Sequence, residues 1–202
     1  MTIKAVIFDM GGVLVRTENR EPRAALGLRF DKTYNELDGI VFGNKSSGRA
    51  SRGEVSAREH MLHVMRTLGL PETDQAIIDF RAEFFGGDKV DYEMIAEIDG
   101  LRPQYKTALL SNAWDDLRGL LVDTWKIDHA FDHLTISAEV RIAKPDAGIY
   151  TFTLEKLGVA PEEAVFVDDF IENIEAARAL GMRGIHFQER DAAMNELRGL
   201  LK

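Results

Sequence analysis

Apolar residues gather in short blocks, and each block is closed by polar residues or glycine. The first block runs from Ile3 to Phe8, is rich in β-branched residues, and stops at Asp9 and a glycine pair. A run of this length and composition is typical of a buried strand that ends in a tight turn. Later blocks share this texture, so we predict further strands at residues 107–110, 134–137, 164–167 and 184–187.

Helical spacing separates these blocks. Asp146 can N-cap a helix whose apolar face carries Tyr150, Leu154 and Leu157, and Gly158 follows its end. Similar patterns predict helices at residues 94–98, from about residue 113, and around residues 174–180. Strands that alternate with helices favour a parallel sheet with helices on both faces. The sequence therefore predicts the α/β class with a Rossmann-like parallel-sheet core.

The pattern changes between the first predicted strand and residue 90. Charged residues interleave with apolar ones at helical spacing, as in residues 61–68. We interpret residues 17–90 as an inserted α-helical cap domain. Residues 1–16 and 91–202 then form the α/β core domain.

Composition narrows the classes of function. The 202 residues are 45% hydrophobic and 29% charged, as in a soluble globular protein of one core domain with a sizeable insertion. A net charge of −9 repels nucleic acid and anionic membranes, so we expect neither as a partner. Cysteine is absent, which excludes disulfides and thiolate chemistry and fits the cytoplasmic location that we expect. The sequence does not indicate an oligomeric state.

Polar side chains follow the predicted strands, at the edge where open parallel sheets bind their ligands. Each of these residues alone is ordinary, because an aspartate after a strand is a cap or turn residue about three times in four. Their common position at strand ends favours a functional site. The set consists of Asp9, Ser111, Asn112, Lys144, Asp168 and Asp169.

Three carboxylates this close repel one another unless a cation lies among them. Without cysteine or a well-placed histidine, the available ligands are oxygens, which favours Mg²⁺ over zinc. The hydroxyl of Ser111, the amide of Asn112 and the ammonium of Lys144 would form a phosphate cradle beside the cation. Backbone N–H groups of a helix that begins after Asn112 would add to it.

Four ordered motifs resemble those of the haloacid dehalogenase superfamily over nearly the full chain, in particular its phosphatase branch with a small helical cap. Motif one is usually Asp-x-Asp-Gly-Thr/Val and here reads Asp-Met-Gly-Gly-Val from Asp9. Motif two is Leu-Ser-Asn ending at Asn112, and motif three is Lys144-Pro145. Motif four is Asp168-Asp169, with Glu172 and Asn173 after it.

The resemblance implies a fold, an activity and a role for each residue. The fold is the HAD fold, and the activity is hydrolysis of a small phosphorylated molecule, possibly a sugar phosphate. Asp9 would attack phosphorus and form an aspartyl-phosphate. Ser111 and Asn112 would hold the phosphoryl oxygens, and Lys144 would neutralise negative charge on Asp9 and on the phosphate. Mg²⁺ would be bound by Asp9, the main-chain carbonyl of Gly11, Asp169 and Asp168.

The second aspartate of motif one, the usual general acid and base, is replaced by Gly11. General acid catalysis is worth roughly 10² to 10⁴ in rate. Another carboxylate such as Glu18 or Glu54 would have to supply the proton, or the substrate would carry a good leaving group, or the enzyme would be slow. Because relatives with glycine here include sugar-phosphate phosphatases, the resemblance favours an active enzyme.

Two other functions stay open. A 2-haloacid dehalogenase shares the aspartate nucleophile, the Ser-Asn pair and the lysine, but it uses no metal and typically lacks the acidic pair of motif four. A catalytically weak protein that binds a phosphorylated ligand would also fit Gly11. The retained charges at Asp9, at Lys144 and at both acids of motif four, Asp168 and Asp169, argue against a decayed site, because unpaired buried charges lower stability.

Two groups in the cap and near motif two have ordinary explanations. His60 and His63 are three residues apart on a predicted helix, but without a third ligand we expect a partly exposed helix face rather than a metal site. Phe80, Phe84 and Phe85 form an apolar stripe that is either core or cavity lining. Trp114 would pack under the cap or contact substrate. Substrate identity lies in the cap and cannot be inferred from one sequence.

Overall fold

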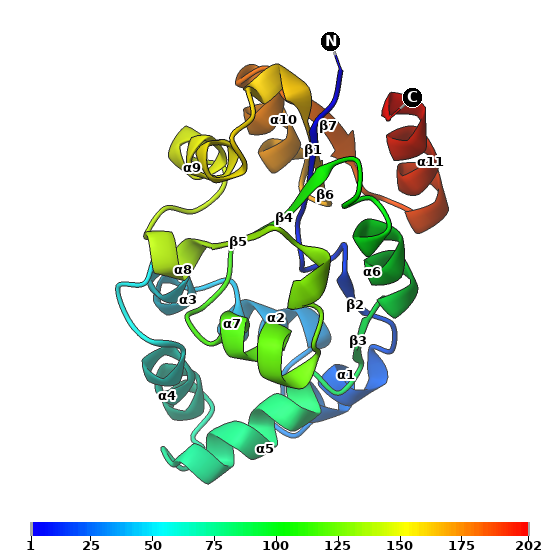
Figure 1. Ribbon diagram of the computed structural model, residues 1–202. Coiled ribbons are helices and arrows are strands. Elements are labelled where there is room, and N and C mark those ends of the chain that lie inside the picture. Colours follow the sequence, from blue (N-terminus) through cyan, green and yellow to red (C-terminus); the bar gives the residue numbers. More distant parts are fainter. Residues whose placement is uncertain (1, 202) are drawn as a thin grey trace.

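Five parallel strands form the central sheet of the computed structural model, which describes residues 2–201. They are β1 (Ala5–Phe8), β4 (Lys106–Ser111), β5 (His133–Ile136), β6 (Ala164–Asp168) and β7 (Arg183–His186), in the order β5-β4-β1-β6-β7 (Figure 1). The predicted α/β class with a Rossmann-like parallel sheet is therefore confirmed.

Helices cover both faces of this sheet because side chains of a strand alternate between its faces. Val6 and Phe8 of β1 belong to one hydrophobic cluster, and Ala5 and Ile7 belong to the other. The first cluster is completed by α6 (Tyr92–Asp99) and α11 (Arg190–Leu200), and the second by α9 (Ala147–Leu157) and α10 (Ile171–Ala179).

The sheet order places β1 at the centre, with β4 on one side and β6 on the other. The chain continues from β1 to β4 and β5, and later adds β6 and β7 on the opposite side of β1. Such a reversal opens a crevice beyond the carboxyl ends of the central strands. Phe8 pairs with Leu109 and Val167, so the register brings the residues after these strand positions to one level.

Five helices are inserted between the two strands of a small antiparallel ribbon, β2 (Val15–Thr17) and β3 (Asp88–Val90). They lie below the sheet in Figure 1 and are α1 (Glu21–Leu28), α2 (Tyr34–Val41), α3 (Lys45–Ser51), α4 (Ala57–Thr67) and α5 (Asp74–Phe84). A third hydrophobic cluster joins them and includes one residue of the core, Trp114. The division of the chain at residues 17 and 90 stays a prediction, and the ribbon spans both positions.

Local sequence explains where several cap helices begin. Thr33 and Glu36 form a capping box at the start of α2, and Ser56 and Glu59 form another at the start of α4. Each box satisfies two backbone N–H groups that would otherwise lack partners. None of the helices that the structure describes is long and apolar enough to cross a bilayer.

The helix predicted from about residue 113 begins later, so that prediction is wrong at its start. The α-helical turn α7 (Leu117–Gly119) continues as a π-helix, η1 (Leu120–Thr124). Ala113 instead bonds to Ser137, whose Oγ accepts from the Ala113 N–H at 3.0 Å. This tertiary contact uses the N–H group and holds the segment after β4 away from helical geometry. Residues 113–116 therefore provide no helix N-terminus for a phosphate.

Short elements complete the fold. The 3₁₀ turns η2 (Asp128–Ala130) and η3 (Pro161–Glu163) precede β5 and β6, and α8 (Ser137–Val140) follows β5. We did not predict α8, the ribbon or α11 from the sequence.

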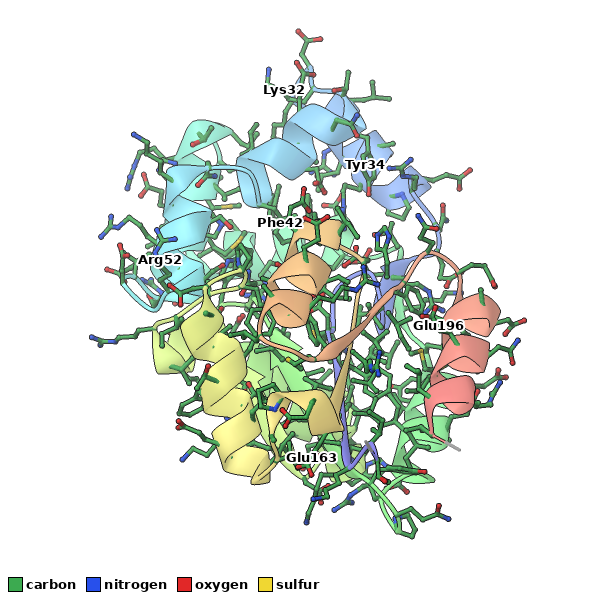
Figure 2. All side chains as sticks on the ribbon, turned by 90° about the horizontal axis from the view of Figure 1, so that it is seen from above. Lys32, Tyr34, Phe42, Arg52, Glu163 and Glu196 are labelled. Carbon is green, nitrogen blue, oxygen red and sulfur yellow. The ribbon has the colours of Figure 1, made fainter. Side chains whose placement is uncertain are left out.

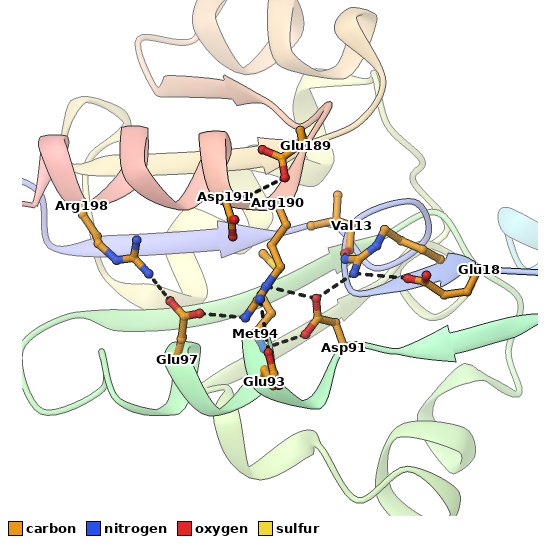
Figure 3. Close-up of polar contacts among 11 residues, drawn as sticks. Val13, Glu18, Asp91, Glu93, Met94, Glu97, Glu189, Arg190, Asp191 and Arg198 are labelled. Atoms are coloured by element: carbon orange, nitrogen blue, oxygen red, sulfur yellow. Dashed lines mark hydrogen bonds and ion pairs between the residues drawn. The ribbon is translucent and has the colours of Figure 1, made fainter.

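An ion-pair network ties the ribbon to the core (Figure 3). The Asp91 carboxylate accepts hydrogen bonds from Arg16 at 2.7 Å and from the Met94 N–H at 2.9 Å. Arg190 of α11 lies 3.3 Å from the same carboxylate and bonds to Glu97 of α6. Asp91, which follows β3, thus connects Arg16 of β2 with the core helices α6 and α11.

Candidate active site

Asp9 is the first residue beyond the central strand, and it lines a cavity between core and cap. Its N–H donates to the Val167 carbonyl at 2.9 Å, which continues the ladder with β6 and fixes the backbone. The residue is 6% exposed, and Lys144 Nζ lies 2.7 Å from its Oδ1. Burial raises the pKa of the Asp9 carboxyl to about 7, although the Lys144 ammonium opposes this rise.

Lys144 lies between two carboxylates. Its Nζ is 2.7 Å from Asp9 and donates to Asp168 Oδ2 at 2.6 Å. The loop that carries Lys144 is held by the side chain of Asn112, whose Nδ2 donates to the Lys144 carbonyl and whose Oδ1 accepts from the Lys144 N–H, both at 2.8 Å. A residue 32 positions earlier in the chain therefore fixes the ammonium in place.

The two acids of the fourth motif have different surroundings. Asp168 is fully buried and accepts hydrogen bonds from Lys144, from the Phe170 N–H and from Asn173 Nδ2. Asp169 lines the cavity, and its Oδ1 is buried without a hydrogen-bond partner among the described residues. Burial and the neighbouring Asp168 charge raise the pKa of Asp169 to about 6.

The carboxylates of Asp9, Asp168 and Asp169 each offer an oxygen within 4.8 Å of the others. Three acids at this spacing, all oxygen donors, suit a hard divalent cation such as Mg²⁺. The unpartnered oxygen of Asp169 is an available ligand, whereas both oxygens of Asp168 already accept hydrogen bonds. These residues fit a metal, and Asp169 has the freer carboxylate of the pair.

The turn after Asp9 contains Gly11 and Gly12, and it requires glycine only at position 12. A Cβ atom on Gly12 would lie 2.2 Å from Asp169 Oδ2, and the residue has φ +81°, so a side chain there is excluded. A Cβ atom on Gly11 would meet nothing within 4 Å. Space therefore exists at Gly11 for the carboxylate that motif one usually carries.

Both polar residues of motif two, Ser111 and Asn112, line the cavity, but their contacts differ. Ser111 ends β4, is buried and lines the cavity. Asn112 also lines it. Its Oδ1 and one N–H of its amide bond to Lys144, and the amide carries a second N–H, so a contact of this side chain with phosphoryl oxygens stays a prediction. The two bonds also hold the backbone of Lys144. Periodicity gives no signal for this long-range pair.

The cavity has a volume of about 1250 Å³ and is bounded by both the core and the cap. Its lining includes six of the predicted site residues, Asp9, Gly11, Ser111, Asn112, Lys144 and Asp169. Asp168 lies outside the lining, behind Lys144. The cap contributes side chains that the sequence did not single out, among them Arg23, Tyr34 and Phe42.

Two suggested proton donors are not in this cavity. Glu18 and Glu54 are exposed and absent from its lining, and Glu54 pairs with Arg49 and Arg52. The suggestion that either supplies the leaving-group proton is therefore wrong in this arrangement. Glu18 follows strand β2 of the ribbon, and Glu54 lies between α3 and α4. Sequence spacing does not show that these segments place both side chains outside the cavity lining.

His60 is buried rather than partly exposed, contrary to our expectation. Its Nε2 lies 2.9 Å from the Val41 carbonyl and its Nδ1 lies 3.1 Å from Ser46 Oγ, while its ring packs 4.7 Å from Trp114. Both ring nitrogens have partners within the cap, which agrees with a structural role and not with a metal site.

Known proteins resemble this chain over most of its length. It is 30% identical to the sesquiterpene phosphatase astK of Aspergillus oryzae, over 99% of this chain and 97% of that protein. It is 31% identical to the D-ribitol-5-phosphate phosphatase of Bacteroides thetaiotaomicron, over 89% of each. It is also 35% identical to bifunctional epoxide hydrolase 2 of Rattus norvegicus, of whose length it spans 38%.

Solved structures share the fold. A HAD-like family hydrolase from Porphyromonas gingivalis superposes with a TM-score of 0.78 at 24% identity, covering 98% of both chains. A HAD family enzyme from Bacteroides thetaiotaomicron, solved as a magnesium complex, gives 0.73 at 25% identity, covering 91% of this chain and 92% of that one. An L-2-haloacid dehalogenase from Xanthobacter autotrophicus gives 0.67 at 23%, covering 100% and 85%.

A family model described as haloacid dehalogenase-like hydrolase matches residues 3–181, which hold every motif residue of the site. The match agrees with the sheet order, the acidic cluster and the phosphatases among the relatives. This chain belongs to the haloacid dehalogenase-like hydrolase family.

Proposed function

We propose that the chain is a Mg²⁺-dependent phosphatase that hydrolyses small phosphomonoesters through an aspartyl-phosphate on Asp9. One observation carries the proposal: Asp9 is buried in the lining of a cavity of about 1250 Å³, 2.7 Å from an ammonium and beside an acid whose Oδ1 has no hydrogen-bond partner among the described residues. A nucleophile, a fixed positive charge and a cation ligand thus meet at one point. The phosphatases among the relatives support the same reaction class.

Asp9, Asp169 and the main-chain carbonyl of Gly11 would hold the cation in this proposal, with Asp168 behind them. The bound cation would neutralise negative charge on the phosphoryl group. Asp168 would act mainly through Lys144, because its oxygens accept hydrogen bonds from that ammonium and from Asn173.

The reaction has two steps. An Asp9 oxygen forms a bond to phosphorus while the bond from phosphorus to the alcohol oxygen breaks, and the alcohol leaves with a proton. Water then attacks phosphorus of the aspartyl-phosphate, which releases inorganic phosphate and restores the Asp9 carboxylate. Lys144 and the end of β4 at Ser111 stabilise the transferring group, so catalysis depends on positioning and fixed charge.

The proton for the leaving group must come from outside motif one, because Gly11 replaces its second aspartate. Four acids besides Asp9 and Asp169 line the cavity: Asp38, Asp88 and Asp116 are each paired with an arginine, and Glu172 is exposed to solvent in the first turn of α10. We propose that solvent supplies the proton. Such an enzyme is slow with alcohols that leave poorly, and faster with esters whose leaving group is stable.

Phosphate release from p-nitrophenyl phosphate and from a panel of sugar phosphates tests the proposal, with and without Mg²⁺. Turnover that needs the metal and disappears in Asp9→Asn and Asp9→Ala is the expected result. Halide release from a 2-haloacid that survives chelation would instead establish a dehalogenase. A folded, metal-loaded protein that binds phosphate but turns over neither class would be a binding protein.

A further inference from the structure

One side of the cavity is built from aromatic rings of both the cap and the core. We call Phe42, Phe85 and Trp114 the aromatic wall; all three line the cavity. Phe42 stacks on Trp114 with ring centroids 5.8 Å apart, and meets Phe85 edge-on at 6.1 Å. Phe42 and Phe85 follow α2 and α5 of the cap, and Trp114 follows β4 of the core.

Phe42 is incompletely buried by these neighbours. Its side chain is 44% exposed, although it touches two other rings of the wall. In Figure 2 it lies toward the middle of the molecule, whereas Lys32 of the same cap lies at the edge. An apolar ring left open to water inside a cavity gains free energy when an apolar ligand covers it.

Buried rings of the cap pack against the aromatic wall. Phe84 is buried and contacts Phe42 at 5.7 Å and Phe85 at 4.9 Å, and Phe80 stacks on it at 5.7 Å. His60 supports Trp114 from within the cap. A preformed surface loses little conformational entropy on binding, so its apolar area is available for affinity.

The charged side chains beside the wall are already paired. Arg23 donates to Asp38, to Asp88, to Tyr34 Oη and to the Phe84 carbonyl. Arg81 pairs with Asp116 and lies over the rings of Phe85 and Trp114. Each of these charges is therefore already balanced by a carboxylate, although Arg81 uses only one of its N–H groups for Asp116. Arg20, which stacks 4.4 Å from the Tyr34 ring, is the lining cap arginine with no carboxylate partner found among the described residues.

The wall is continuous with the phosphate site. Trp114 is three residues after Ser111, and three residues span at most about 11 Å. Asp9 and the three rings line the same cavity, so a hydrocarbon chain attached to a phosphate at Asp9 can extend toward the rings. The cavity volume of about 1250 Å³ leaves room for such a body.

We propose that the substrate is the phosphate ester of an apolar alcohol, whose hydrocarbon chain lies on the aromatic wall while its phosphate contacts Asp9 and Lys144. This inference rests on the proposed phosphatase function and names its substrate class. A polar substrate that uses Arg20 is the competing outcome.

A series of n-alkyl phosphates from ethyl to octyl, kept below their micelle concentrations, tests the inference on the wild-type protein. The leaving groups have nearly equal basicity, so differences report binding of the chain. We expect kcat/KM to rise by up to about fourfold for each methylene group until the wall is covered. Hexyl phosphate should also exceed a hexitol 6-phosphate, which has the same number of carbons.

Phe42→Ala should reduce the octyl-to-ethyl ratio of kcat/KM about tenfold or more, and Phe42→Leu should reduce it less. Leu28→Ala is the matched control, because Leu28 is a 77% exposed residue of the same cap outside the cavity lining, and it should keep the wild-type ratio. Binding of octylphosphonate by calorimetry gives a readout without turnover. It should be tighter than that of ethylphosphonate, with a more negative heat-capacity change.

Each failure has a separate meaning. Turnover of p-nitrophenyl phosphate with no gain along the alkyl series, or with preference for the hexitol ester, overturns the apolar substrate and leaves the phosphatase intact. A preference for the hexitol ester that is lost in Arg20→Ala would identify the polar alternative. No turnover of any ester by the folded, Mg²⁺-loaded protein overturns the phosphatase function, and with it the substrate assignment.

Discussion

The ammonium of Lys144 lies 2.6 Å from the carboxylate of Asp168, and both side chains are almost wholly buried. The same ammonium is 2.7 Å from Asp9, so one positive charge is shared by two acids. Asp168 restrains Lys144 in a position where it can face the proposed nucleophile. The pair links the stability of the core to the chemistry of the site.

Replacing Lys144 by methionine should destabilise the protein by about 3–5 kcal/mol near pH 8, because it leaves two buried carboxylates without a counter-charge. Urea denaturation measures this. The loss should shrink toward pH 5, because burial raises the pKa of the Asp9 carboxyl and this group can then take up a proton. Lys4→Met is the control, since Lys4 pairs with Glu163 on the surface and should cost less than about 1 kcal/mol. Similar losses for both variants would contradict a special role for the buried lysine.

Asp169→Asn and Asp168→Asn should separate metal binding from stability. Asp169→Asn should weaken Mg²⁺ binding about 100-fold or more, since changes to groups that merely support a ligand cost roughly 10–100-fold. Asp168→Asn should lower the free energy of unfolding by about 2 kcal/mol, because a charged acceptor of several hydrogen bonds is lost. Calorimetric Mg²⁺ titration and urea denaturation measure the two effects. The reverse pattern would assign the direct ligand to Asp168.

Gly11→Asp should speed hydrolysis of alkyl phosphates, because a Cβ there meets nothing within 4 Å and the new carboxyl can supply a proton. General acids contribute roughly 10² to 10⁴, so we expect a gain of about tenfold or more in kcat. p-Nitrophenyl phosphate should gain little, because its leaving group needs no proton. Gly11→Asn controls for size.

Gly12→Ala is the steric counterpart and should abolish turnover, because its Cβ would overlap the Asp169 carboxylate at a positive φ. An active Gly12→Ala protein would show that the turn can rearrange.

The Gly11→Asp prediction has its own contradicting outcome. Equal effects of this substitution on alkyl phosphates and on p-nitrophenyl phosphate would exclude a general-acid role for the added carboxyl.

The pH dependence of the rate should change with the metal. Asp9 must be ionised to attack, and its pKa is raised to about 7 by burial, so at low Mg²⁺ the rate should rise with pH through about 7. A cation beside the carboxylate favours its charged form, so saturating Mg²⁺ should move this limb to lower pH. Initial rates from pH 5 to 9 at two Mg²⁺ concentrations test this. A limb that stays in place would argue against a metal beside Asp9.

The free energy of unfolding of the metal-free protein should also depend on pH. Because the folded pKa values of Asp9 and Asp169 lie above the value of 3.8 expected for a free carboxyl, protonation favours folding. Their contribution is complete below about pH 4 and is lost as the pH rises through about 6 to 7. Added Mg²⁺ should restore stability most strongly above pH 7, and thermal unfolding measures the difference.

The sequence by itself determined the five strands of the core and the order of its polar residues. Short β-branched runs such as Ile3 to Phe8 leave few alternatives to a buried strand, and three of the five runs end next to a residue of the site. Parallel strands bring their carboxyl ends together, so the meeting of Asp9, Ser111 and Lys144 in one cavity followed from the pattern. The family motifs pointed to the same residues.

Only the tertiary structure decided what each side chain does there. Sequence did not distinguish Asp168 from Asp169, because the difference is made by Lys144 and Asn173, which approach from other segments. The Asn112 amide likewise bonds to a loop 32 residues away. Periodicity reports which face of an element is buried, but a hydrogen bond between distant segments leaves no periodic trace. The aromatic wall has the same origin, because it exists only where the cap closes over the core.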